Sequence, residues 1–345
     1  MELLKKLSQT PGISGREERI RALIKEELEK LADTVSVDAM GNVIALKKGK
    51  SGRQKVMISG HMDEIGFIVS HIEEKGFLRL SPVGGLDPRN LVAQRVVVHG
   101  REDLRGILMP ASKPVHIMTP EEAKAPLKVS DFYVDLGLSQ EETEKLVRIG
   151  DPVTLDRDFI EFGANASGKA MDDRAGVWVM LEALRQIKDH EADIYAVASV
   201  QEEVGLRGAT TGAYGIHPDI GVALDVTLAV DGPGSSKQFQ VSALGEGPAI
   251  KIMDSASISN YKLVDFMRTI AEENHVKYQM EILPRGGTDA GAIERVHTGC
   301  PVVTLSVPTR YVHSNVETIN KEDLKNAALL LAKFLENVHK GDFTL

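Results

Sequence analysis

The sequence has little cysteine and no long apolar run, and both absences narrow the classes of protein that it can encode. Its 345 residues contain one cysteine, Cys300, so no disulfide can form within the chain. A single thiol in a chain of this length is typical of a reducing compartment. No segment approaches the roughly 20 apolar residues of a membrane-spanning helix, and the first residues soon become charged. We therefore expect a cytoplasmic protein with no signal peptide and no membrane contact.

An excess of basic residues is also missing. The chain carries 41 Lys and Arg against 50 Asp and Glu, which gives a formal net charge of -9. Nucleic-acid binding depends on basic side chains that neutralise phosphates, so this balance argues against a nucleic-acid partner. The length of the chain is sufficient for two domains.

The hydrophobic pattern changes twice along the chain. An amphipathic helix is predicted over 16–31, with Ser14 as its cap. Short β-rich runs separated by Gly and Pro turns fill 66–162, and helices alternate with apolar strands after Phe162. This pattern predicts an α/β fold with a mixed central sheet flanked by helices, formed by 1–65 and 163–345. The stretch 66–162 is predicted to be a small inserted β-rich domain.

Polar clusters lie at the ends of predicted strands and at the start of a predicted helix. Their residues are His61, Asp63, Asp172, Asp173, Glu202, Glu203, Asp225 and His313. Ligand sites of open α/β sheets gather beyond the carboxyl ends of the strands. Each cluster alone also has an ordinary explanation, because a charged residue at a strand end is readily solvated and acidic residues favour a helix start.

The clusters are more informative as a set. Two histidines with several carboxylates form the donor set that zinc, cobalt and manganese prefer, and no cysteine is required. A centre with two ions needs five ligands, one of them a bridging carboxylate, and a further carboxylate that stays free as a base. The clusters supply residues for each of these positions.

Six motifs lie in order along nearly the whole chain. They are GHMDEIGF (60–67), KAMDDRAG (169–176), VQEEVGLRGA (200–209), ALDV (223–226), RGGTDAG (285–291) and PTRYVHS (308–314). With these motifs the sequence closely resembles the tetrahedral, TET-type family of dinuclear metallo-aminopeptidases, which includes glutamyl and deblocking aminopeptidases. The resemblance implies a zinc-exopeptidase-like fold with a PDZ-like dimerisation domain in the insertion. It also implies a homo-oligomer in which dimers assemble into a dodecamer.

The resemblance further implies roles for individual residues. The implied metal ligands are His61 with Asp225 on one ion, Glu203 with His313 on the other, and Asp172 as the bridge between the two. Glu202 is implied as the general base and Asp63 as the residue that orients an imidazole ligand. The implied cofactors are two divalent ions, most often zinc or cobalt, and the peptide bond between Asp172 and Asp173 is expected to be cis. The implied reaction is metal-assisted hydrolysis of the N-terminal peptide bond of short peptides.

Several alternatives stay open at this point. A glycoside hydrolase with Glu202 and Asp172 as paired carboxylates would leave both histidines without a role. An inactive metal-binding scaffold would be expected to lack a ligand or the base, and none is missing. A carboxypeptidase or deacylase of the wider superfamily is the nearest rival. Asp289 either helps to place the substrate or belongs to a purely structural turn, and His116 is assigned no role in the site.

Overall fold

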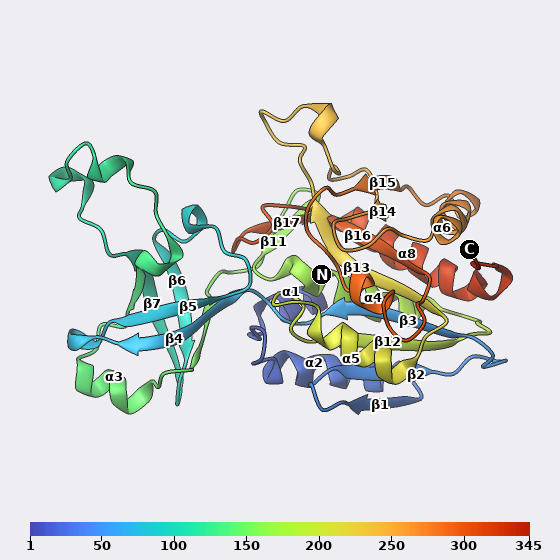
Figure 1. Ribbon diagram of the computed structural model, residues 1–345, viewed down its shortest axis with the longest axis horizontal. Coiled ribbons are helices and arrows are strands. Elements are labelled where there is room, and N and C mark those ends of the chain that lie inside the picture. The colour runs from blue at the N-terminus through green and yellow to red at the C-terminus, as the bar shows by residue number, and fades with distance from the viewer.

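The computed structural model describes residues 1–345 and shows two bodies, an α/β part and a barrel set to one side of it (Figure 1). The helices of the α/β part are α1 (Glu2–Gln9), α2 (Glu18–Glu29), α4 (Met171–Gln186), α5 (Arg207–Ile216), α6 (Tyr261–Glu273), α7 (Ala290–Ile293) and α8 (Lys321–Asn337). Its strands are β1 (Thr34–Val37), β2 (Val43–Lys47), β3 (Lys55–His61), β10 (Ile160–Phe162), β11 (Asn165–Gly168), β12 (Asp193–Ser199), β13 (Ile220–Leu228), β14 (Ala249–Met253), β15 (Gln279–Ile282), β16 (Val302–Arg310) and β17 (Glu317–Asn320). None of the helices is both long enough and apolar enough to span a lipid bilayer.

The strands form one mixed sheet in the order β1-β2-β12-β3-β13-β16-β17-β11-β10, with β14 and β15 attached beside β16. Its centre is parallel, because β12, β3, β13 and β16 run in one direction. The register pairs Ser199 of β12 with His61 of β3. The residues that follow β12 therefore emerge beside His61, at the carboxyl edge of the parallel strands.

Helices cover both faces of this sheet. The larger apolar core joins the sheet to α1, α2, α4, α6 and α8, and a smaller core lies under α5 and α7 on the other face. Helix α4 packs against β3, β13 and α8 at once, and for this reason most of its residues, including Trp178, are buried. The mixed α/β fold predicted from the sequence is confirmed at this level.

The barrel is a separate closed sheet with its own core. Its strands are β4 (Gly66–Ile72), β5 (Leu78–Val83), β6 (Gln94–His99), β7 (Asp103–Pro110), β8 (Phe132–Asp135) and β9 (Pro152–Leu155), and α3 (Gln140–Leu146) is its one α-helix. All of its strand pairs are antiparallel. It encloses 13 buried apolar residues that do not belong to the cores of the α/β part, so it can fold around side chains of its own.

The end of the insertion differs from the sequence analysis. Ile160–Phe162, which lies inside the predicted insertion of 66–162, pairs with β11 and so belongs to the large sheet. We propose that the inserted domain ends near Leu155, the last residue of β9. The sequence pattern does not distinguish an end at Leu155 from an end at Phe162, because short strands of the barrel and of the sheet edge have similar compositions.

Two local predictions were wrong. The strand predicted to stop before Asp225 continues to Leu228, because β13 stays paired with β16 after its pairing with β3 ends at Ala223. Ser14 does not cap the amphipathic helix predicted over 16–31, because that helix, α2, starts at Glu18 without a side-chain cap. The Ser14 hydroxyl instead donates a hydrogen bond to Oδ2 of Asp63 at 2.6 Å.

Candidate metal centre

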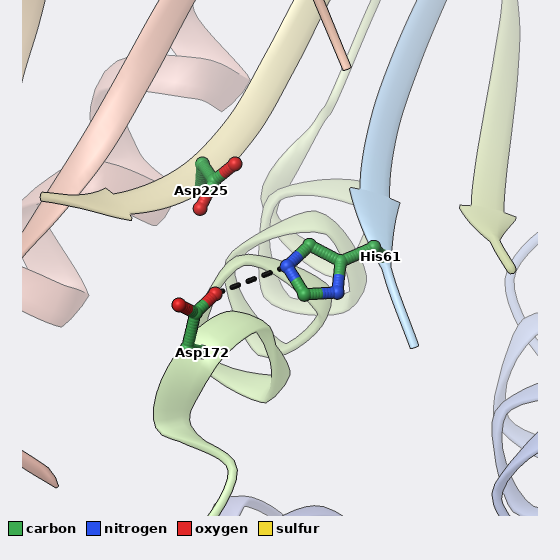
Figure 2. Close-up of side chains that lie close together, drawn as sticks. All are labelled: His61, Asp172 and Asp225. Carbon is green, nitrogen blue, oxygen red and sulfur yellow. Dashed lines mark hydrogen bonds and ion pairs between the residues drawn. The ribbon is translucent and has the colours of Figure 1, made fainter. Parts of the chain in front are cut away.

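The side chains singled out in the sequence converge at the carboxyl edge of the parallel strands. His61 is the last residue of β3, and Asp225 lies on the part of β13 that extends past β3. Asp172 lies at the start of α4 and faces both of them (Figure 2). Glu202 and Glu203 follow β12, and His313 follows β16. Segments more than 200 residues apart in sequence therefore meet at one place.

His61, Asp172 and Asp225 form a first group of possible metal ligands. One donor atom from each lies within 4.8 Å of the other two. Nε2 of His61 is 3.0 Å from Oδ1 of Asp172 (Figure 2). All three side chains are largely buried, so an ion between them would be shielded from solvent.

Asp172, Glu203 and His313 form a second group with the same spacing limit of 4.8 Å. Nε2 of His313 is 3.5 Å from Oδ2 of Asp172 and 3.5 Å from Oε2 of Glu203. The two oxygens of Asp172 thus face different histidines, one in each group. A carboxylate in this position can bridge two cations.

The electrostatics of the site fit the addition of positive charge. Burial raises the pKa of Asp225 and of Glu202 well above the ordinary range, and raises that of Glu203 to about 8. Burial lowers the pKa of His313, but its hydrogen bond to Asp172 and the nearby carboxylates outweigh this and raise it to about 10. The cluster therefore holds more buried carboxylate than positive charge. Divalent cations would supply the missing charge, and imidazole with carboxylate is the right donor chemistry for zinc or cobalt.

Asp63 connects His61, at the end of β3, with the loop that carries Glu202 and Glu203. Its carboxylate accepts hydrogen bonds from the backbone N–H of Glu202 at 3.0 Å and of Glu203 at 3.2 Å. Its Oδ1 also lies 3.5 Å from Nδ1 of His61, the ring nitrogen that points away from Asp172. Asp63 is fully buried, so one carboxylate sets the position of a histidine and of the loop that carries Glu202.

Glu317 also holds two segments of the site through backbone hydrogen bonds, those of His313 and Asp172. The sequence analysis missed this residue. Its Oε1 accepts a hydrogen bond from the backbone N–H of His313 at 2.7 Å, and its Oε2 accepts one from that of Asp172 at 3.0 Å. Glu317 is 1% exposed, and burial raises its pKa to about 8. The signal in the sequence was a glutamate four residues after His313, at the start of a strand, just outside the last motif.

The adjacent residue Asp173 has a different environment from Asp172. The peptide bond between them is cis, as the resemblance implied. Asp173 is fully buried and accepts a hydrogen bond from the Gly176 N–H at 2.9 Å. A side chain at Gly176 would begin 2.4 Å from its carboxylate oxygens, so only glycine leaves room there. Of the two aspartates, Asp172 is the one among the donor groups.

Two adjoining cavities open onto the donor groups. The first, of about 360 Å³, is lined by both glutamates after β12 and by Asp172, Asp225 and His313. The second, of about 260 Å³, shares Asp172, Asp225 and His313, and extends to apolar residues and to Lys251. Nζ of Lys251 lies 3.1 Å from Oε1 of Glu281, so its charge is already paired. Spaces of this size suit one or two amino-acid residues rather than a folded protein.

The loop that contains Asp289 contributes to the cavities through its glycines. Gly286 and Gly287 line both cavities. Asp289 itself is 2% exposed, and its Oδ2 accepts hydrogen bonds at 2.6 Å from the hydroxyls of Ser59 and Ser199. It thereby joins β3 to β12 beneath the site, and this favours the structural interpretation of Asp289. His116 lies in an exposed turn of the barrel, away from the donor groups.

Comparisons with known proteins show similarity to aminopeptidases over nearly the whole chain. The sequence model of the family described as M42 glutamyl aminopeptidase matches residues 41–330. The lysyl aminopeptidase of Pyrococcus furiosus is 38% identical, over 99% of both chains. The solved structure of an aminopeptidase from the archaeon Desulfurococcus kamchatkensis is 43% identical, with a TM-score of 0.93 over 97% of this chain and 94% of that one. A Pyrococcus horikoshii TET1 peptidase, described as assembling into a tetrahedron or a large octahedral shell, is 34% identical, with a TM-score of 0.86 over 97% and 98% of the two chains.

Proposed function

The chain belongs to the M42 glutamyl aminopeptidase family and is a metal-dependent hydrolase of peptide bonds, and on that premise we propose that it removes the N-terminal residue of short peptides at a centre of two divalent ions. The observation that carries the proposal is the pair of donor groups that share Asp172, with Glu202 beside them. Zinc and cobalt are the ions that this donor set favours.

Asp172 would be the ligand that the two ions share. His61 and Asp225 would complete one set of ligands, and Glu203 and His313 would complete the other. When bound, the ions supply Lewis acidity, which lowers the pKa of a water molecule and polarises the carbonyl of the scissile bond. Asp63 and Glu317 hold the ligands in place through the backbone hydrogen bonds described above.

Glu202 acts as the general base and then as the general acid. Its carboxyl group lines the first cavity, and its Oε2 is 3.9 Å from Nε2 of His61, next to the donor groups. It accepts a proton from the attacking water and delivers that proton to the amine that leaves. Burial raises the pKa of Glu202 in the metal-free site, and the positive charge of two bound ions would lower it again, so that the carboxylate can accept a proton.

Acidic side chains around the first cavity account for the preference for a free N-terminus. A substrate ammonium group is attracted to this carboxylate cluster, and a blocked N-terminus lacks the charge that is recognised. A glycoside hydrolase with Glu202 and Asp172 as its pair is disfavoured, because both oxygens of Asp172 are already directed at histidines. A carboxypeptidase is disfavoured because carboxylates outnumber basic side chains in the cavity lining: Lys251 is paired with Glu281, and Arg285 is the one basic residue left unpaired.

We also propose that the barrel is a PDZ-like dimerisation domain and that dimers assemble into a dodecamer. The TET1 relative forms closed shells, and the barrel projects from the α/β part, where it can reach another copy (Figure 1). Light scattering coupled to size-exclusion chromatography tests this directly. A single species at the chain mass of 37.6 kDa would contradict it.

The catalytic proposal is tested with matched substrates and controlled metal content. The metal-free enzyme is assayed on an aminoacyl-p-nitroanilide panel and on N-acetylated versions of the same compounds. Activity should return with zinc or cobalt at two equivalents per chain, and only the unblocked substrates should be cleaved. Cleavage of acetylated substrates, or full activity in excess chelator, would contradict the proposal.

A further inference from the structure

The barrel lies directly against the second donor group. Gly84 and Gly85, in the segment that follows β5, approach Glu203 and His313 through their backbone. A Cβ atom at Gly84 would be 3.2 Å from Oε2 of Glu203, and one at Gly85 would be 3.0 Å from Nδ1 of His313. Both distances are shorter than ordinary van der Waals contact, so a side chain at either glycine would require Glu203 or His313 to shift by a few tenths of an ångström.

A hydrogen bond connects the barrel to the loop that carries His313. Oε1 of Gln94, the first residue of β6, accepts a hydrogen bond from Nδ2 of Asn315 at 2.7 Å. The Gln94 amide is held in turn by a 3.0 Å hydrogen bond from its Nε2 to the carbonyl of Asn90. Asn315 is 4% exposed and lies two residues after His313. Asn315, on the loop side of this contact, is therefore buried. Gln94, on the barrel side, is held in its orientation by Asn90.

The loop needs such contacts because its backbone is strained. Tyr311 and His313 have φ values of 62° and 61°, in the left-handed region that side chains other than glycine rarely adopt. Each such residue costs roughly 1 kcal/mol or more and persists where the surroundings hold it. The α/β part holds His313 through Glu317, and the barrel holds Asn315 through Gln94.

We propose that the barrel is a structural part of the second ion site, with Gln94 as a positioning residue that acts on His313 through Asn315. The proposal rests on the proposed function, because it takes Asp172, Glu203 and His313 to be ligands. The first donor group has no equivalent dependence. The hydrogen bonds of His61 and Asp225 all go to residues of the α/β part. Loosening the Gln94 contact should therefore weaken one ion and leave the other unchanged.

A second contact between the two bodies provides the control. Arg19 of α2 makes two hydrogen bonds to the carboxylate of Asp103 in the barrel, at 2.6 and 2.8 Å. Both side chains are about half exposed, and neither touches a residue of the donor groups. Arg19→Ala thus removes a contact between the same two bodies without affecting the loop of His313.

The test is calorimetric titration of zinc into the metal-free, full-length chain in the presence of a competing chelator. Gln94→Ala should lower the affinity for one ion by about 10- to 100-fold, the range typical of residues that orient a ligand. Gln94→Glu, whose carboxylate still accepts from Asn315 but cannot donate to the Asn90 carbonyl, should recover part of that loss. Arg19→Ala should bind both ions as the unaltered chain does.

The outcomes separate this inference from the proposed function. If the unaltered chain binds fewer than two ions, the proposed function fails. If it binds two, the inference fails when Gln94→Ala leaves both affinities unchanged, weakens both equally, or matches Arg19→Ala. Gly85→Ala is a second probe, because its new methyl group presses on His313 and should weaken the same ion. Gly232→Ala is its control, since a methyl group there meets no atom within 4 Å.

Discussion

The two donor groups have the same chemistry but different supports. His61 and Asp225 lie on β3 and β13, in the centre of the sheet, and are 2% and 6% exposed. Glu203 and His313 lie on segments outside the strands, and the His313 side chain is 37% exposed. The first group is part of the rigid sheet, whereas the second depends on loops and on the barrel.

We therefore expect the site to combine a fixed half, His61 and Asp225, with an adjustable half, Glu203 and His313. Central strands keep their positions because every neighbouring strand and both helical layers constrain them. Loops keep theirs through a few hydrogen bonds, such as those from His313 to Glu317 and from Asn315 to Gln94. We expect the fixed half to bind its ion more tightly and the adjustable half to release its ion first.

The largest effect is expected at Glu202, which serves both halves. Glu202→Gln keeps the shape of the side chain but cannot accept a proton, so kcat should fall by about 10²- to 10⁴-fold. Metal content measured by mass spectrometry should stay at two ions per chain. Glu273→Gln, at the exposed end of α6, is the control. Turnover close to that of the unaltered enzyme would show that another group is the base.

The next largest effect is expected when either of the two histidines is replaced. His313→Ala should lose one ion, with an affinity reduced by at least about 100-fold, and keep the other. His61→Ala should lose the ion of the fixed half. In the unaltered chain, stepwise chelation followed by metal analysis should remove the ion of the adjustable half first. If both ions leave in a single step, the two halves are not independent and the comparison is wrong.

A smaller effect is expected at Glu317. Glu317→Gln replaces one of its two acceptor oxygens with a donor, so either His313 or Asp172 loses its backbone hydrogen bond. The affinity for an ion should fall by about 10-fold, the lower end of the range for a residue that holds ligands in place. Glu322→Gln, at the exposed start of α8, is the matched control. Unchanged titration curves would show that this carboxylate is not needed to hold the ligands.

The last effect is on stability rather than on metal affinity: it concerns the loop that carries Glu202 and Glu203, and it depends on pH. Glu17 is 3% exposed, and its Oε1 accepts hydrogen bonds from the N–H groups of Gly15 and Gln201. Burial raises its pKa from 4.5 to about 7. Between these values the folded chain binds more protons than the unfolded chain, so this group's contribution to stability falls as pH rises from 4.5 through 7. The loss is at most about 3 kcal/mol.

Glu17→Gln should remove that loss. An amide oxygen can replace Oε1 in both hydrogen bonds, and the amide does not ionise. The variant should therefore melt a few degrees higher than the unaltered chain at pH 8 and at the same temperature at pH 4, as measured by scanning calorimetry. Glu18→Gln, at an exposed neighbour, should show no such difference. A variant that is less stable at pH 8 would mean that the charge of Glu17 is itself stabilising.

Much of the fixed half could be anticipated from the sequence. A run of apolar residues predicts a buried strand, and polar residues directly after it predict a site at the sheet edge, as for His61 and Glu202. The structure brings Asp225 into the first donor group, but the sequence analysis placed it after a strand that in fact continues through it. Strand length depends on which neighbour the strand pairs with, and the apolar pattern does not contain that information.

The supports of the site could not be anticipated. Glu317 and Glu17 accept hydrogen bonds from backbone N–H groups of other segments, and a hydrogen bond to a backbone N–H leaves no mark on the residue type of its partner. Gln94 accepts its hydrogen bond from the side chain of Asn315, which is far away in the sequence. Ser14 was interpreted as a helix cap because serine before an amphipathic helix usually is one. Its hydroxyl instead reaches Asp63, 49 residues further along the chain.

The sequence by itself determined the class of fold and the kinds of side chain at the strand ends, because apolar periodicity and side-chain chemistry are local properties. Only the tertiary structure decided how Asp172 divides its two oxygens, which carboxylates hold the ligands, and that the barrel lies against His313. These features depend on distances between segments that are far apart in the chain. They follow from sheet register and packing, which no single stretch of sequence specifies.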